Sequence, residues 1–243
     1  TQGKHDRPRS VAQGKPNAFG LYDMHGNVWE YVADWWHEMS YKEAPLNDPT
    51  GPDEPHERGD LRRIIRGSSF DWDSAGGDAA YRMRITQHSG QHPHMGFRVA
   101  MRIKGAQGVP PAFDPKDELR RKRRDPGADS KDVVSSLQAT ARNDKLPKEL
   151  TIDLGGGVQM EFVLIPAGSF LMGSEHGPQD ERPVHRVVLS RPFYMAKFPV
   201  IQAQWEAVVG KQGRLKELED LWEKNPDTIG ASKVMVGLNW NDC

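Results

Sequence analysis

Residues 17–36 have the sequence Asn17-Ala-Phe-Gly-Leu-Tyr-Asp-Met-His-Gly-Asn-Val-Trp-Glu-Tyr-Val-Ala-Asp-Trp-Trp36. Aromatic residues, acids and glycines are mixed there without a helix or strand period. Asp23, Gly26, Val28 and Glu30 are spaced like a loop that wraps a hard cation, because two carboxylates and the backbone carbonyls between them can supply the oxygen ligands that calcium prefers. Glycine lets the chain turn tightly enough to point those carbonyls inward. The alternative is a turn between two strands with its acids in solvent, since the spacing is not that of an EF-hand.

The run from Asn17 to Glu30 resembles the signature of the formylglycine-generating enzyme (sulfatase-modifying factor) family. That family has a C-type-lectin-like fold. The resemblance therefore implies a loop-rich α+β fold with short antiparallel strands and few short helices, incomplete in this chain. It also implies a structural calcium ion held by oxygens at Asp23, Gly26, Val28 and Glu30.

Composition agrees with a loop-rich architecture. The chain of 243 residues is 36% apolar and contains 24 glycines, 18 prolines and seven tryptophans, which predicts a core of a few large rings. The net charge of −1 gives no long-range attraction to nucleic acid or to a membrane surface, and no apolar run is long enough to span a membrane. The single cysteine excludes an internal disulfide. The sequence starts at Thr1, with neither an initiator methionine nor a signal peptide, so we expect it to begin inside a longer protein. The sequence does not indicate a cellular compartment.

Two more motifs lie in the first half of the chain, residues 1–104. Arg66-Gly67-Ser68-Ser69 resembles the Arg-Gly-Gly-Ser turn of the family, and it follows a predicted short strand. Gly96-Phe97-Arg98 resembles the strand that closes the family domain, and its alternation predicts one strand over Gly96–Ile103. The resemblance identifies residues 1–104 as the C-terminal half of a sulfatase-modifying-factor-type domain.

Residues 105–148 differ in kind from the rest of the chain. They are charged and poor in aromatic residues, so they cannot bury enough area to offset the entropy of ordering, and we predict a linker. The basic run Arg120–Arg124 could be a nucleic-acid or localisation patch, but a solvated linker suits the nearly neutral overall charge better.

The second half, residues 149–243, begins with two strands joined by Gly155-Gly-Gly157, which predicts a hairpin because no phosphate-binding pattern accompanies the glycines. Gln202–Val209 predicts a helix that ends at Gly210, with Trp205, Val208 and Val209 on its buried side. A second short helix is predicted from Leu215 to Trp222.

This half resembles the beginning of the same family domain. The matching segments are Ile165–Ser174, Asp180–His185 and Leu238–Cys243, whereas the central section of the family domain is absent. The reversed order predicts a piece of a tandem-domain protein; a circular permutant is the alternative. We expect the two halves to pack together, with residues 158–165 near residues 96–103, because an open strand edge is usually covered.

Family enzymes oxidise a sulfatase cysteine to formylglycine with copper and a pair of cysteines, whose thiolates suit Cu(I) and redox chemistry. The corresponding stretch, Phe70–Ala80, contains no cysteine: Trp72 stands about where the first would be, and Gly76 or Gly77 about where the second would be. Cys243 lies outside that stretch and is expected to be a small buried residue. The resemblance therefore implies no catalytic residue and no copper in this chain.

Other candidate cation ligands are the histidines His88, His92 and His94 and the acids Asp71, Asp73 and Asp78, all of which we expect to face solvent. Two functions stay open. The chain is either an enzyme-family module whose oxidoreductase chemistry is lost or carried by a neighbouring domain, or a non-enzymatic module that binds a protein or peptide ligand on its loops.

Overall fold

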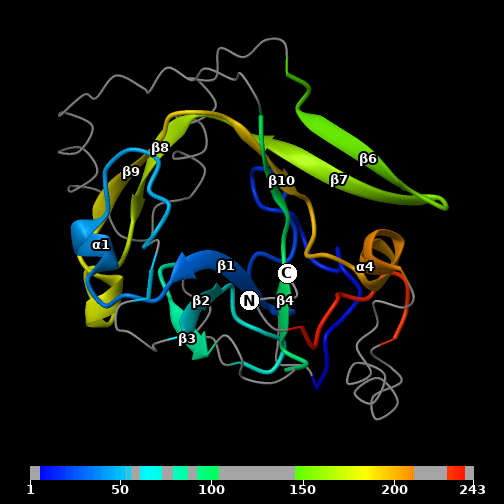
Figure 1. Ribbon diagram of the computed structural model, residues 1–243, viewed down its shortest axis with the longest axis horizontal. Coiled ribbons are helices and arrows are strands. Elements are labelled where there is room, and N and C mark those ends of the chain that lie inside the picture. Colours follow the sequence, from blue (N-terminus) through cyan, green and yellow to red (C-terminus); the bar gives the residue numbers. More distant parts are fainter. Residues whose placement is uncertain are drawn as a thin grey trace.

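Strands carry most of the regular structure in the computed structural model, which describes residues 6–52, 54–55, 61–72, 79–86, 92–103, 146–210 and 229–238. The strands are β1 (Trp29–Trp35), β2 (Arg62–Arg66), β3 (Met83–Thr86), β4 (Met95–Phe97), β5 (Ala100–Arg102), β6 (Glu149–Gly155), β7 (Val158–Ile165), β8 (Gly168–Met172), β9 (His185–Leu189) and β10 (Phe193–Ala196). The helical elements are α1 (Ser40–Glu43), the 3₁₀ turn η2 (Gln179–Glu181) and α4 (Gln202–Val209). The prediction of a loop-rich α+β fold with short strands and few short helices is confirmed (Figure 1).

The first half of the chain forms a four-stranded sheet in the order β3-β2-β1-β4. β2 lies antiparallel between β1 and β3, whereas β1 and β4 are parallel, with Trp29 opposite Met95. The alternation of the strands places Trp29, Tyr31, Ile65 and Met95 together in a buried cluster. The sheet thus has one parallel pair that the expectation of antiparallel strands did not include.

A second four-stranded sheet, in the order β5-β10-β7-β6, combines strands from both halves. β5 pairs with β10, so that Tyr194 lies opposite Met101, and β10 in turn pairs with β7. The expected packing of residues 158–165 near residues 96–103 is therefore confirmed, with β10 lying between them. The strand edges that each half would expose alone cover each other here.

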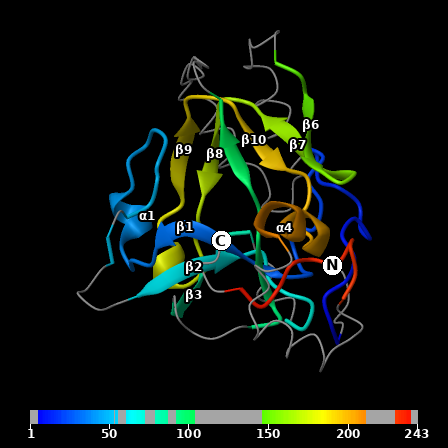
Figure 2. The same ribbon diagram turned by 45° about the vertical axis from the view of Figure 1, so that its right-hand side comes forward.

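Further contacts join the halves around this sheet. The loop after α1 pairs with β9 through a parallel bridge between Asn47 and Val188, and Asp48 Oδ1 accepts a hydrogen bond of 2.7 Å from the Ser190 backbone. Val28 packs in a buried cluster with Val234 and Val236. Figures 1 and 2 show β8 and β9 beside α1 on one side of the molecule and the β6–β7 hairpin above α4 on the other.

The predicted single strand over residues 96–103 is wrong. It divides into β4, which joins the first sheet, and β5, which joins the second. Between them the chain changes partners: the Phe97 carbonyl accepts a hydrogen bond from Val200 N, and the Val99 carbonyl accepts one from Ala196 N, each at 2.9 Å. The break depends on strands distant in the sequence, so local alternation could not predict it.

The helix α4 has the predicted bounds and ends at Gly210, whose φ of 81° suits glycine. Its predicted buried side is partly wrong, because Val208 and Val209 are 68% and 44% exposed. The first turn is buried instead: the side-chain amide of Gln204 donates 2.8 Å to the Gln159 carbonyl, and Gln202 Oε1 accepts from Gly230 N. Buried glutamines are stable there because their polar groups are hydrogen-bonded.

Several sequence predictions lie outside the described residues: the linker over most of residues 105–148, the helix from Leu215 to Trp222, and Cys243. Within the described part of the chain, no helix is long and apolar enough to cross a membrane.

The shared sheet predicts that the halves stay together after the chain between them is cut. A protease site introduced within residues 105–148 and then cleaved should give two fragments that co-elute on a sizing column, because β5 and β10 remain paired. Fragments that separate at micromolar concentration would contradict this prediction.

Candidate functional site

The glycine loop, residues 23–30, turns back on itself just before and at the start of β1. Asp23, Gly26 and Asn27 have φ angles of 54°, 82° and 67°, in the left-handed region that residues other than glycine rarely adopt. The Gly26 amide donates a hydrogen bond of 2.7 Å to the Gly67 carbonyl, and the Gly26 carbonyl accepts one of 3.0 Å from Val28 N. The loop is thus fixed by its own backbone and by the turn that follows β2.

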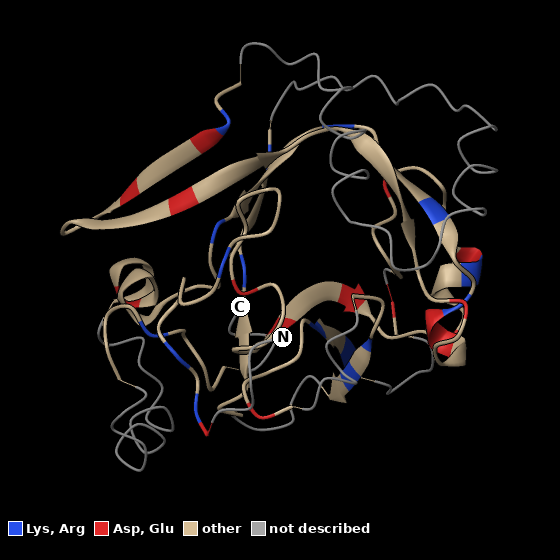
Figure 3. Cartoon of the chain, turned by 180° about the vertical axis from the view of Figure 1, so that it is seen from behind, with Lys and Arg blue, Asp and Glu red and all other residues tan. Residues whose placement is uncertain are grey.

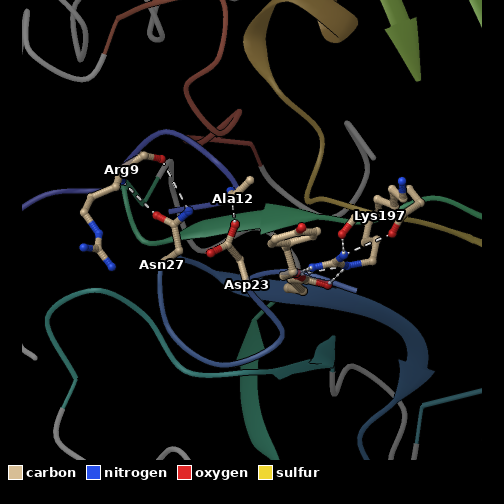
Figure 4. Close-up of polar contacts among 9 residues, drawn as sticks. Arg9, Ala12, Asp23, Asn27 and Lys197 are labelled. Carbon is tan, nitrogen blue, oxygen red and sulfur yellow. Dashed lines mark hydrogen bonds and ion pairs between the residues drawn. The ribbon is translucent and has the colours of Figure 1, made fainter. Parts of the chain in front are cut away.

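Two side chains connect the loop to the segment from Arg9 to Ala12 (Figure 4). The Asp23 carboxylate accepts a hydrogen bond of 2.9 Å from Ala12 N through Oδ2. Asn27 is buried, its Oδ1 accepts from Arg9 N at 2.9 Å, and its amide nitrogen donates to the Arg9 carbonyl at 3.4 Å. These bonds offset part of the strain of the left-handed backbone.

Glu30 forms a buried ion pair with Arg98. The two side chains are 13% and 3% exposed, and the guanidinium donates from Nη2 to Oε1 at 2.7 Å and from Nε to Oε2 at 3.0 Å. Bidentate Arg–carboxylate pairs of this kind are among the strongest charge-assisted hydrogen bonds in proteins. Arg98 also donates to three carbonyls: Tyr22 and Lys197 at 2.7 Å and Ala196 at 3.0 Å. Figure 4 shows Arg9 and Asn27 on one side of Asp23 and Lys197 on the other.

The four predicted calcium positions lie in this one loop, and their donors are chemically suited to calcium. Asp23 and Glu30 carry carboxylates, whereas Gly26 and Val28 can offer only backbone carbonyls, because neither has an oxygen atom in its side chain. Each carboxylate already has a protein partner: Asp23 binds Ala12 N, and Glu30 binds Arg98. A calcium ion would therefore have to share the Glu30 carboxylate with the Arg98 guanidinium. At Asp23 it would share the carboxylate with one backbone N–H group, that of Ala12.

The turn after β2, residues 66–72, contacts the glycine loop. Gly67 and Ser68 have φ angles of 93° and 67°, and Phe70 N donates to the Asn27 carbonyl at 3.0 Å. A Cβ at Gly67 would approach the Met24 carbonyl to 3.1 Å, which explains glycine at that position. Backbone contacts therefore fix this turn without help from the side chain at Trp72.

Asp71 is the polar centre of the turn. Its Oδ1 accepts a hydrogen bond of 2.6 Å from Ser69 Oγ and lies 3.3 Å from His94 Nδ1. The His94 ring stacks on Phe70, with ring centroids 5.0 Å apart. Trp72, at the expected position of the first family cysteine, is 42% exposed and meets Trp29 edge to face at 5.7 Å. The side chain at this position is therefore an indole, and the polar groups nearby include the carboxylate of Asp71 and the imidazole of His94. None of these groups is a soft thiolate ligand.

The remaining metal candidates are not assembled into a site in the part of the chain that is described, where no group of three or more His, Cys, Asp or Glu side chains could hold a metal ion. That part includes Asp71, His92 and His94. His88, Asp73, Gly76, Gly77 and Asp78 lie outside it.

Sequence reasoning missed two features of the site: the role of Arg98 as the partner of Glu30, and the contact between Asp71 and His94. Glu30 and Arg98 lie 68 positions apart, and no local spacing relates them. The Gly-Phe-Arg motif marked the position of Arg98, but it did not identify its partner.

The chain matches one family model and is similar in part to several known proteins. A family model described as the sulfatase-modifying factor enzyme 1-like domain matches residues 1–103 and 157–243. The chain is similar to the formylglycine-generating enzyme of Streptomyces coelicolor, with 33% identity over 95 residues that cover 37% of this chain and 28% of that protein. It is also similar to the formylglycine-generating enzyme of Thermomonospora curvata, with 45% identity over 58 residues that cover 23% and 18%.

A third relative is named as inactive. It is the inactive C-alpha-formylglycine-generating enzyme 2 of Mus musculus, with 35% identity over 89 residues that cover 35% of this chain and 22% of that protein. Each alignment thus spans less than a third of the relative's length.

Substitution of Arg98 tests the buried ion pair. We expect Arg98→Met to lower the free energy of unfolding by about 3–5 kcal/mol, because it leaves the Glu30 carboxylate buried without its counter-charge. Urea denaturation gives the value, and the exposed Arg102→Met on β5 should change it by less than about 0.5 kcal/mol. Adding Glu30→Gln to Arg98→Met should restore part of the loss; equal effects of Arg98→Met and Arg102→Met would refute this role.

Proposed function

Because the chain belongs to the sulfatase-modifying factor enzyme 1-like family, we propose that it is part of a tandem protein of that family and keeps the family scaffold without its thiol-based oxidation. The observation that carries this proposal is the turn after β2, where Trp72 and Asp71 stand in the region expected to hold the cysteine pair. Oxidation of a substrate cysteine to formylglycine then belongs to a neighbouring domain of the longer protein or is lost.

The chemistry of the turn supports this proposal. Copper-dependent oxidation requires two thiolates close together, and the whole chain has one cysteine, Cys243. Asp71 is engaged by Ser69 and lies against His94, so its oxygens hold the turn in shape. The name of the mouse relative shows that inactive proteins occur among the relatives of this chain.

The order of the two halves supports the tandem arrangement. We propose that residues 1–104 are the C-terminal half of one domain, that residues 105–148 are a linker, and that residues 149–243 are the N-terminal half of the next domain. The family model leaves residues 104–156 unmatched, a stretch that includes the proposed linker and also β6. The pairing of β5 with β10 joins the two halves, so that each covers a strand edge of the other.

We also propose that calcium is a structural cofactor of the glycine loop, held by the carboxylates of Asp23 and Glu30 and by the carbonyls of Gly26 and Val28. Bound calcium would supply positive charge to these two carboxylates. Arg98 supplies such charge at Glu30 alone, so the larger gain is expected at Asp23.

An activity assay tests the loss of oxidation. The purified chain, copper and a reductant are incubated with a peptide that carries a sulfatase cysteine motif, and aldehyde formation is followed by mass spectrometry. We expect no conversion above a control with copper but without protein, because no cysteine pair is present. Reproducible conversion above that control would overturn the proposal.

Thermal unfolding tests the calcium site. Calcium should raise the melting temperature relative to excess EGTA, and a free concentration a hundredfold above Kd corresponds to about 2.7 kcal/mol of stabilisation. The quantity to compare between variants is this calcium-dependent increase in melting temperature. A variant of the second carboxylate, Glu30→Gln, would also lower the melting temperature without calcium, because it breaks the pair with Arg98. Asp23→Asn should remove most of the increment, and Glu175→Gln, at an exposed position far along the chain, should not. An increment of zero in the wild type, or an unchanged one in Asp23→Asn, would exclude this site.

A further inference from the structure

One face of the β2–β3 ribbon is rich in arginine. The strands pair with Ile64 opposite Arg84 and Arg62 opposite Thr86, so the alternation of side chains places Arg62, Arg66 and Arg84 on the same face. Arg82, just before β3, extends the same row. Figure 3 shows the blue Lys and Arg positions on these two strands.

Two aromatic rings hold these arginines in place. The guanidinium carbons of Arg62 and Arg84 each lie 4.4 Å from the centre of the Trp36 ring, and those of Arg82 and Arg66 lie 4.5 and 5.9 Å from the centre of the Tyr41 ring. Cation–π contacts of this kind orient a guanidinium without neutralising it. The face is therefore ordered before any ligand arrives.

The hydrogen bonds of Arg66 and Arg82 go to neutral groups of the described residues. Arg66 donates to the carbonyls of Ala79 and Tyr81 and to the Tyr41 hydroxyl, and Arg82 donates to Ser40 Oγ and the Asp180 carbonyl. Within the described residues, neither these two arginines nor Arg84 forms a salt bridge with a carboxylate.

Asp34 is the acid whose charge acts on both Arg66 and Arg82, and burial raises its pKa in spite of them. Burial lowers the pKa of Arg82, and the charge of Arg66 lowers it further. The charges of Asp180 and Asp34 act in the opposite direction. Because Arg66 and Arg82 act on each other as like charges, an anion bound beside them would reduce their repulsion.

Exposure decides which part of the face a ligand can reach. Arg82 is 6% exposed beneath α1 and η2, whereas Arg62 and Arg66 are half-buried and Arg84 is exposed. The reachable part is therefore the end of the ribbon around Trp36.

We propose that the exposed Arg84, together with the half-buried Arg66 on the same face, binds an acidic peptide segment of a partner protein. Guanidinium groups bind carboxylate or phosphate oxygens through paired hydrogen bonds, and the aromatic rings beneath them fix their direction. A nucleic acid is a poorer match, because it needs contacts to many phosphates, whereas the chain has a net charge of −1 and its basic groups here cover one short ribbon. The inference goes beyond the proposed loss of oxidation and does not depend on it.

A peptide-binding titration tests the proposal. Fluorescein-labelled peptides of equal length are titrated with the full 243-residue chain and followed by anisotropy: one rich in Glu, one that carries phosphoserine and one in which Gln replaces the acids. The acidic peptide, the phosphorylated peptide or both should bind, the difference showing which oxygens are preferred, and the Gln peptide should not. Arg84→Gln should weaken binding about tenfold, which corresponds to about 1.4 kcal/mol.

The controls separate this face from general charge effects. Arg102→Gln removes one exposed arginine from β5, in the other sheet, and should leave affinity unchanged. Arg84 is exposed, so its variant should keep the wild-type melting temperature. Equal losses in both variants, equal binding of the Gln peptide, or tighter binding of a single-stranded oligonucleotide would overturn the proposal.

Discussion

The buried guanidinium of Arg98 is the contact on which the structure depends most. It neutralises Glu30 at the end of the glycine loop and donates to carbonyls at Tyr22, Ala196 and Lys197, which come from both halves of the chain. A buried carboxylate is costly unless it is paired and hydrogen-bonded, so the loop, β4 and the end of β10 must stay in register for Glu30 to keep its partner Arg98. The position of the loop is thereby coupled to the pairing of the two sheets.

This coupling explains how a chain with two separate family-like blocks forms one set of shared sheets. β5 has too few residues to be stable by itself, and it gains its partner only when β10 is present. Residues 105–148, roughly 45 residues, join the two halves, and the entropic cost of closing such a connection rises only slowly with its length. Burial of Phe97 and Met101 against Phe162 and Tyr194 then opposes that cost.

Local features were predictable from the sequence because they depend on local chemistry. The hairpin at Gly155–Gly157, the turn at Gly67 and the end of α4 at Gly210 all have positive φ angles that glycine tolerates. The division of residues 96–103 was not predictable, because it is imposed by β1 and β10, whose paired residues lie between 66 and about 95 positions away. In the site, the resemblance identified the glycine loop, but the pairing of Glu30 with Arg98 and of Asp71 with His94 depends on tertiary contacts that no spacing encodes.

The turn after β2 is held by its backbone and not by the side chain at Trp72. Its shape is set by the left-handed Gly67 and Ser68 and by two backbone hydrogen bonds, from Gly26 N to the Gly67 carbonyl and from Phe70 N to the Asn27 carbonyl. None of these contacts uses the side chain of Trp72, so the side chain at that position can change without altering the backbone that presents it. The indole is held by Trp29, which also packs in the core of the first sheet. A family scaffold can therefore outlast its oxidative chemistry, because the groups that hold the turn differ from the groups that would react on it.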